Sequence, residues 1–129
     1  MKLVHLLPLL LATGAAHADA PPAVVTTLMT HALADRPGKE VTLLSVAYPP
    51  GGASAAHRHE ADAFVYVLEG AIVMGVAGGK AVTLGPGETF REGRDDIHTI
   101  SRNASDTKPA KFVVFLIKDI GKPVQLPVD

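Results

Sequence analysis

Residues 51–70 read Gly-Gly-Ala-Ser-Ala-Ala-His-Arg-His-Glu-Ala-Asp-Ala-Phe-Val-Tyr-Val-Leu-Glu-Gly, and this stretch decides the fold. It places His57 two residues before His59, and His98 follows in a later segment. Side chains at positions i and i+2 lie on the same face of a β-strand. Imidazole is the commonest protein ligand for transition metals. The spacing therefore predicts two histidines on one strand face, with a third from a distant strand able to join them.

The rest of the chain predicts an all-β domain. Turn signals rich in Gly, Pro, Asn and Asp recur along it and separate short runs of β-branched and aromatic residues, a pattern typical of a sandwich or barrel. Residues 24–33 are ambiguous, and we favour a strand there. The other expected strands are Val41–Ala47, Phe64–Leu68, Ile72–Val76, Ala81–Leu84, His98–Ser101 and Phe112–Lys118.

The histidine pair lies within a recognisable motif. Five residues separate Gly51 from His57, and His59 is followed by Ala63 and then, after six residues, by Gly70. This pattern resembles the first motif of the cupin superfamily, Gly-(x)5-His-x-His-(x)3,4-Glu-(x)6-Gly. Every fixed position matches except the Glu, which is Ala63 in this chain.

A second cupin motif, Gly-(x)5-Pro-x-Gly-(x)2-His-(x)3-Asn, is matched less well. The spacing from Gly87 to His98 is kept, with Gly93 in place of the Pro and Asp95 in place of the second Gly. The Asn is displaced by one position, to Asn103. The resemblance implies a single jelly-roll β-barrel with a metal or ligand site inside.

The likeness is greatest to small exported bacterial cupins and covers roughly residues 40–120. We therefore expect a cupin domain over residues 40–120, preceded by an N-terminal arm at 19–39. A Pro-bearing tail at 121–129 follows, and it is able to add an edge strand.

The cupin resemblance implies a divalent transition metal, Fe, Mn, Ni, Cu or Zn, bound by His57, His59 and His98. Ala63 cannot bind a metal, so the expected ligand set is three neutral imidazoles with open positions for water or substrate. The alternative is a relict site, in which the three histidines line a pocket that holds no metal.

Two carboxylates, Asp62 and Glu92, lie near enough in the sequence to replace the missing Glu. Asp62 would need a β-bulge to turn inward, because strict alternation points it away from the site. Glu92 has the same parity as His98, but a turn separates the two residues. We expect both to be solvated, Asp62 being the better candidate. The two tyrosines offer no convincing general base, because Tyr66 has the wrong parity and Tyr48 precedes a Pro-Pro turn.

The outward face of the central strand predicts a partner. If the histidines point into a barrel, then Phe64, Tyr66 and Leu68 point outward and need a cover. We expect a homodimer through this face; the alternative is coverage by the chain's own terminal strands.

The first 18 residues resemble a secretory signal peptide. Lys2 precedes an apolar run from Leu3 to Leu11, and Ala16-His17-Ala18 matches a cleavage site. We expect cleavage after Ala18, with Ala20 as second choice, and a periplasmic or secreted protein with no membrane contact once the signal is removed.

The amino-acid composition limits the classes of partner and of metal site that this chain can have. Loss of Lys2 leaves 11 Lys and Arg against 13 Asp and Glu, a formal charge of −2, which argues against a nucleic-acid partner. The absence of cysteine excludes thiolate metal sites and disulfides.

Two functions from different classes remain open. The first is a metal-dependent oxygenase or isomerase acting on a small organic molecule. The second is a non-enzymatic periplasmic module that binds a metal or small ligand in a degenerate site, which the missing Glu favours slightly. The sequence does not decide whether the protein is an enzyme, because function belongs to the site and not to the fold.

Overall fold

A computed structural model describes residues 19–129, so the expected signal peptide at 1–18 lies outside the described residues. This part of the chain consists of ten β-strands joined by turns and loops. The first five are β1 (Val24–Ala32), β2 (Lys39–Tyr48), β3 (His57–Arg58), β4 (Ala61–Glu69) and β5 (Ile72–Val76). The others are β6 (Val82–Leu84), β7 (Thr89–Glu92), β8 (Ile97–Asn103), β9 (Ala110–Asp119) and β10 (Leu126–Pro127). Within residues 19–129, no helix has the length and apolar character needed to cross a membrane.

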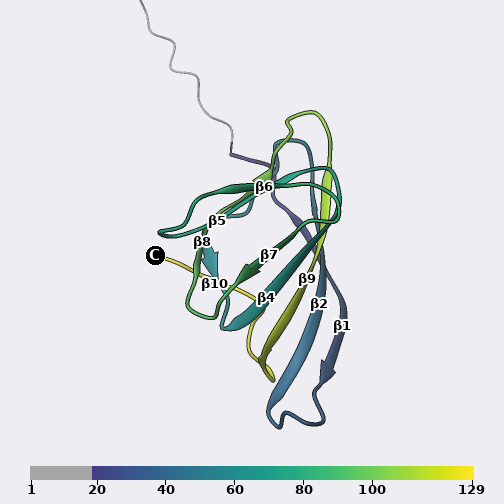
Figure 1. Cartoon of the computed structure of the whole chain (residues 1–129), viewed down its shortest axis with the longest axis vertical. Coiled ribbons are helices and arrows are strands. Elements are labelled where there is room, and N and C mark those ends of the chain that lie inside the picture. Colours follow the sequence, from purple (N-terminus) through teal and green to yellow (C-terminus); the bar gives the residue numbers. More distant parts are fainter. Residues whose placement is uncertain (1–18) are drawn as a thin grey trace, which may run out of the picture.

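The strands form two antiparallel sheets, whose order is β1-β2-β9-β4-β7 in the first and β10-β3-β8-β5-β6 in the second. Figure 1 shows β1, β2, β9 and β4 running side by side, with β5, β8 and β10 beside them in the other sheet. This architecture confirms the predicted all-β jelly roll.

The core lies between the sheets, and period-two alternation builds it. In β4, Ala61, Ala63, Val65 and Val67 are buried, while the residues between them face outward. Strands β2 and β9 alternate in the same way. Burying one apolar face of each sheet against the other is the main stabilising contribution in such a sandwich.

Three motif glycines are explained by backbone conformation. Gly51, Gly70 and Gly87 have φ angles of 68°, 69° and 85°, in the left-handed region that disfavours side chains. At Gly70, a Cβ atom would also collide with the carbonyl oxygen of Pro109. The turn that ends β4 therefore requires glycine for both reasons.

The chain's terminal strands do not cover the outer face of β4. Strand β1 lies at the far edge of the same sheet, and β10 belongs to the other sheet. Phe64, Tyr66 and Leu68 are consequently 41%, 45% and 47% exposed. Within residues 19–129, the alternative of coverage by the terminal strands is wrong.

Candidate metal centre

The three predicted histidines come together between the sheets. His57 of β3 is paired directly with His98 of β8 in the antiparallel ladder, so both side chains leave the second sheet on the same face. His59 follows β3 at i+2 and returns to that face. All three are buried, with exposures of 6%, 3% and 7% for His57, His98 and His59.

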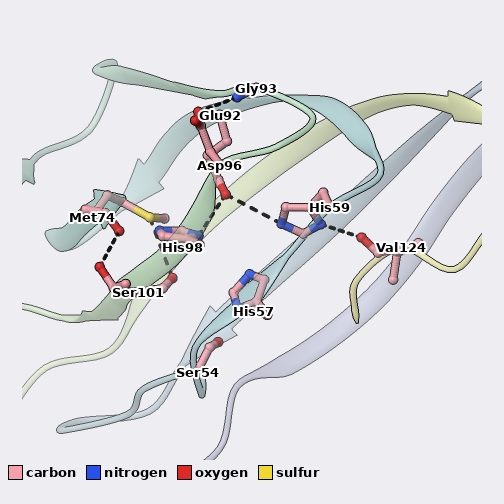
Figure 2. A network of polar contacts seen from close by, with 12 residues as sticks. Ser54, His57, His59, Met74, Glu92, Gly93, Asp96, His98, Ser101 and Val124 are labelled. Atoms are coloured by element: carbon pink, nitrogen blue, oxygen red, sulfur yellow. Dashed lines mark hydrogen bonds and ion pairs between the residues drawn. The ribbon is translucent and has the colours of Figure 1, made fainter. Parts of the chain in front are cut away.

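A fourth polar side chain, Glu92, completes the cluster from the opposite sheet. It is the last residue of β7, is 2% exposed, and points at the histidines (Figure 2). Its Oε2 atom lies 3.0 Å from His98 Nδ1 and 3.7 Å from His59 Nε2. The prediction of a solvated Glu92 is therefore wrong, and the structure places a carboxylate beside the three predicted histidines.

The better-ranked candidate, Asp62, stays outside. The alternation of β4 continues without a bulge from Ala61 to Val65, so the Asp62 side chain points away from the cavity. There it accepts a hydrogen bond from Arg91 Nη2 at 3.0 Å. The sequence feature that could have identified Glu92 as an inward-facing residue is the alternation within β7. Half-buried Phe90 and buried Glu92 lie two positions apart and share one face of the strand.

Backbone carbonyls orient two of the imidazoles. His57 Nδ1 lies 2.8 Å from the carbonyl oxygen of Ala55, and His59 Nδ1 contacts the carbonyl oxygen of Val124. A carbonyl can only accept a hydrogen bond, so both Nδ1 atoms carry the proton and both Nε2 atoms keep a free lone pair. Burial lowers the pKa of His57, which favours the neutral imidazole that a metal requires.

Three buried atoms of the cluster make no well-directed hydrogen bond among the described residues, although the first two lie 3.0 Å apart: Glu92 Oε2, His98 Nδ1 and His98 Nε2. Unpaired buried polar atoms are costly, and a bound cation would satisfy Glu92 Oε2 and one of the two His98 nitrogens. One ligand atom from each of the four residues lies within 4.8 Å of all the others. Three nitrogens and one carboxylate oxygen suit Mn, Fe, Ni, Cu or Zn. The cluster could therefore hold a metal ion.

The loop between Glu92 and His98 is held by a side-chain contact. Asp96 Oδ2 accepts a hydrogen bond from the Gly93 N–H at 2.7 Å, which closes the turn between β7 and β8. This is the turn-stabilising role expected of an Asp at this position. This turn connects Glu92 to the strand that carries His98, and both residues belong to the cluster.

A cavity of about 50 Å³ adjoins the cluster. Its polar wall contains Tyr48, Ser54 and Ser101, linked by hydrogen bonds. Tyr48 Oη lies 2.8 Å from Ser54 Oγ and 2.6 Å from Ser101 Oγ, and it donates to the Ser101 carbonyl oxygen at 3.1 Å. From the sequence, Tyr48 is not a convincing general base, because a Pro-Pro turn follows it. In the structure Tyr48 ends β2 with its side chain inside the barrel.

Most of the remaining wall is apolar. Leu44 and Val46 of β2, Val65 of β4 and two residues of β9, Phe112 and Val114, line it. Burial raises the pKa of the Tyr48 phenol, so this group keeps its proton at neutral pH. The cavity thus combines neutral hydroxyls, apolar walls and, among the described residues that line it, one carboxylate, Glu92.

Comparison with known proteins agrees with this geometry. A cupin domain family model matches residues 44–116. A cupin domain from Bordetella pertussis Tohama I is similar in structure, with a TM-score of 0.62 and 25% identity, covering 78% of this chain and 98% of that one. No curated protein matches the chain.

Two enzymes of known activity share the fold. Oxalate oxidase in complex with the substrate analogue glycolate has a TM-score of 0.62 and 27% identity, over 82% of this chain and 55% of that one. The DMSP lyase DddQ from Ruegeria pomeroyi DSS-3 has a TM-score of 0.60 and 19% identity, over 68% of this chain and 43% of that one. The chain spans only about half the length of these two proteins, and the likeness to the lyase concerns fold alone.

The motif around His57 and His59, the two-sheet barrel, and a family match that spans most of the strands all lead to one assignment. The chain belongs to the cupin domain family.

Proposed function

We propose that this protein is a metal-dependent cupin enzyme, which holds one divalent transition metal through His57, His59, Glu92 and His98. The observation that carries the proposal is the position of Glu92. A carboxylate buried next to three histidines, with its Oε2 close to His98 Nδ1 but in no well-directed hydrogen bond, is costly unless a cation compensates it. When bound, the metal would supply Lewis-acid polarisation of a coordinated substrate.

Charge indicates the class of substrate. A divalent cation with one carboxylate ligand keeps a net positive charge, and among residues 19–129 no Lys or Arg lines the cavity to compete with it. The volume of about 50 Å³ leaves room for only a few non-hydrogen atoms. We therefore propose a short-chain carboxylic acid as substrate. The likeness to oxalate oxidase, solved with glycolate, supports this class.

The chain's own residues would perform three tasks. The carbonyls of Ala55 and Val124 keep His57 and His59 in the metal-binding tautomer. The hydroxyls of Ser54 and Ser101 lie on the cavity wall, where either one could turn from Tyr48 Oη and donate to a substrate oxygen. The apolar wall excludes water, which strengthens the electrostatic interactions within the cavity.

The sequence argument that slightly favoured a non-enzymatic binding module no longer applies. That argument was the missing carboxylate of the first cupin motif, and Glu92 supplies a carboxylate from another strand. Turnover remains the property that separates the two classes, so the test must measure both binding and reaction.

The test begins with the metal content of the purified protein by mass spectrometry, next to a His57→Ala/His59→Ala variant. We expect near-stoichiometric metal in the parent and little in the variant. Loaded protein is then mixed with glycolate and oxalate, while oxygen uptake and product formation are followed. Binding without turnover would assign a binding module. A parent that refuses Mn, Fe, Ni, Cu and Zn would contradict the metal site.

A further inference from the structure

The segment 121–127, here termed the C-terminal strap, joins one sheet to the other. It leaves β9 of the first sheet and ends as β10, which pairs with β3 of the second sheet. In Figure 1 this last part of the chain runs from the end of β9 to the side of the barrel where β10 lies. The strap therefore closes the gap between the sheets on that side.

A buried ion pair anchors the beginning of the strap. Glu40 of β2 is paired in register with Lys118 of β9, and Lys118 Nζ donates to Glu40 Oε1. The same Nζ donates to the carbonyl oxygen of Lys122 at 2.7 Å. The N–H of Gly121 reaches Glu40 Oε1 at 3.4 Å. Lys118 is 4% exposed, so these contacts are shielded from solvent.

The far end of the strap lies against the metal cluster. His59 Nδ1 donates to the carbonyl oxygen of Val124, 65 positions along the chain. Strand β10 then pairs Leu126 with Arg58 and Pro127 with His57. The strap thus touches the backbone of one histidine and the ring of another, as Figure 2 shows for Val124 and His59.

The strap also forms part of the cavity wall. Val124 and Gln125 line the cavity together with Val25 of β1. Strands β1 and β10 are edge strands of their sheets, so the sheets themselves do not close the cavity here. Displacement of the strap would open the cavity and release the imidazole of His59 at the same time.

We infer that the C-terminal strap is a positioning element of the metal site. It fixes His59 as the Nδ1–H tautomer, with Nε2 toward the cluster, and closes the cavity beside it. The part of this inference that concerns metal binding rests on the proposed function. The part that concerns the tautomer of His59 does not, because the strap sets that tautomer in the metal-free protein.

The test compares two truncations of the full chain. Ending the chain at Lys122 removes Val124 and β10, whereas ending it at Pro127 removes only Val128 and Asp129 and serves as the matched control. Nitrogen-15 NMR of the metal-free proteins reports the tautomer of His59. Competition titration with Zn²⁺ alone reports the affinity.

We expect Nδ1–H at His59 in the parent and the control, and a mixture of tautomers in the shorter protein. Its zinc affinity should fall about 10- to 100-fold, as for other groups that orient a metal ligand. A parent with Nε2–H at His59, or a shorter protein with unchanged tautomer and affinity, would overturn the inference.

A second measurement uses the intact protein, in case the shorter one does not fold. Coupling between metal and strap is reciprocal, so zinc should slow hydrogen exchange at the amides of residues 124–127. Unchanged exchange at saturating zinc would overturn the inference. If the parent binds neither zinc nor Mn, Fe, Ni or Cu, the proposed function fails, and the tautomer of His59 still decides the role of the strap.

Discussion

Ala63 and Glu92 are directly paired residues of the antiparallel strands β4 and β7. Paired residues project from the same face of a sheet, with Cβ atoms about 5 Å apart. Ala63 occupies the position of the Glu in the first cupin motif, and Glu92 carries a carboxylate on the neighbouring strand. In this chain the carboxylate therefore lies on the strand next to the one that carries the Glu in the motif, on the same inner face of the sheet.

This relationship predicts that the carboxylate can be moved back. Glu92→Ala should weaken metal binding by at least about 10- to 100-fold, the loss typical for groups that only orient a ligand. The double variant Ala63→Glu/Glu92→Ala should recover part of that loss, because the new carboxylate enters the space left by the old one. Isothermal titration with Zn²⁺ measures both.

Asp62→Ala is the control for the exchange of carboxylates. Asp62 points outward to Arg91, so its removal should leave the metal affinity unchanged. Equal affinity in the parent and Glu92→Ala would show that the three histidines bind the metal without this carboxylate.

The buried hydroxyl of Tyr48 should contribute to stability and to substrate binding. Tyr48→Phe removes the hydrogen bonds to Ser54 and Ser101 and should cost about 0.5–1.5 kcal/mol of unfolding free energy. It should also raise the KM for a short carboxylic acid, because the two serine hydroxyls lose their fixed orientation. Tyr66→Phe, on the outer face, is the matched control; similar losses in both variants would contradict the role of Tyr48.

Acid should weaken the anchor formed by Glu40 and Lys118. The hydrogen bond from Lys118 lowers the pKa of Glu40 in the folded protein. A lowered pKa adds stability that is complete above the ordinary carboxyl pKa and disappears as the pH falls through the folded value. Urea unfolding at a series of acidic pH values should show a shallower pH dependence for Glu40→Gln than for the parent. The exposed Glu69→Gln should behave as the parent does; if both variants coincide, the ion pair is not the cause.

Backbone contact makes Gly70 less replaceable than Gly78. Both have positive φ, so an alanine costs about 1–2 kcal/mol at either position. A Cβ at Gly78 meets nothing within 4 Å, whereas one at Gly70 would collide with the carbonyl oxygen of Pro109. Gly70→Ala should therefore lower the melting temperature clearly further than Gly78→Ala. Equal shifts in melting temperature would mean that the loop around Pro109 rearranges to accommodate the Cβ without a further loss of stability.

The outer face of β4 and β9 predicts self-association. Phe64 and Phe115 are paired across the two strands at its centre, and Tyr66, Leu68 and Ile117 extend it, all 37–47% exposed. We expect a homodimer through this face, since apolar surface of this kind is commonly buried between subunits. Sedimentation velocity should show a dimer for the parent and a monomer for Phe64→Glu. Val82→Glu, at an exposed apolar residue of the other sheet, is the control; a monomeric parent at micromolar concentration would contradict the dimer.

Local rules of the sequence determined the fold and most of the site. Period-two alternation, glycines at turns and the spacing of His57 and His59 depend on neighbouring residues only, and so could be recognised without a structure. The motif also indicated that His98 belongs with them. The same alternation correctly pointed Asp62, Phe64 and Tyr66 outward.

Tertiary structure alone decided which distant groups meet at the cluster. Glu92 contributes because β7 pairs with β4 opposite Ala63, and this register depends on contacts between strands that no local pattern contains. The same holds for Tyr48, which reaches the cavity from β2, and for the Val124 carbonyl, which is a backbone atom that any residue would provide. The sequence thus determined the fold and the three histidines of the cluster, whereas the packing of the two sheets decided the carboxylate, the hydroxyls of the cavity wall and the segment that covers the cavity.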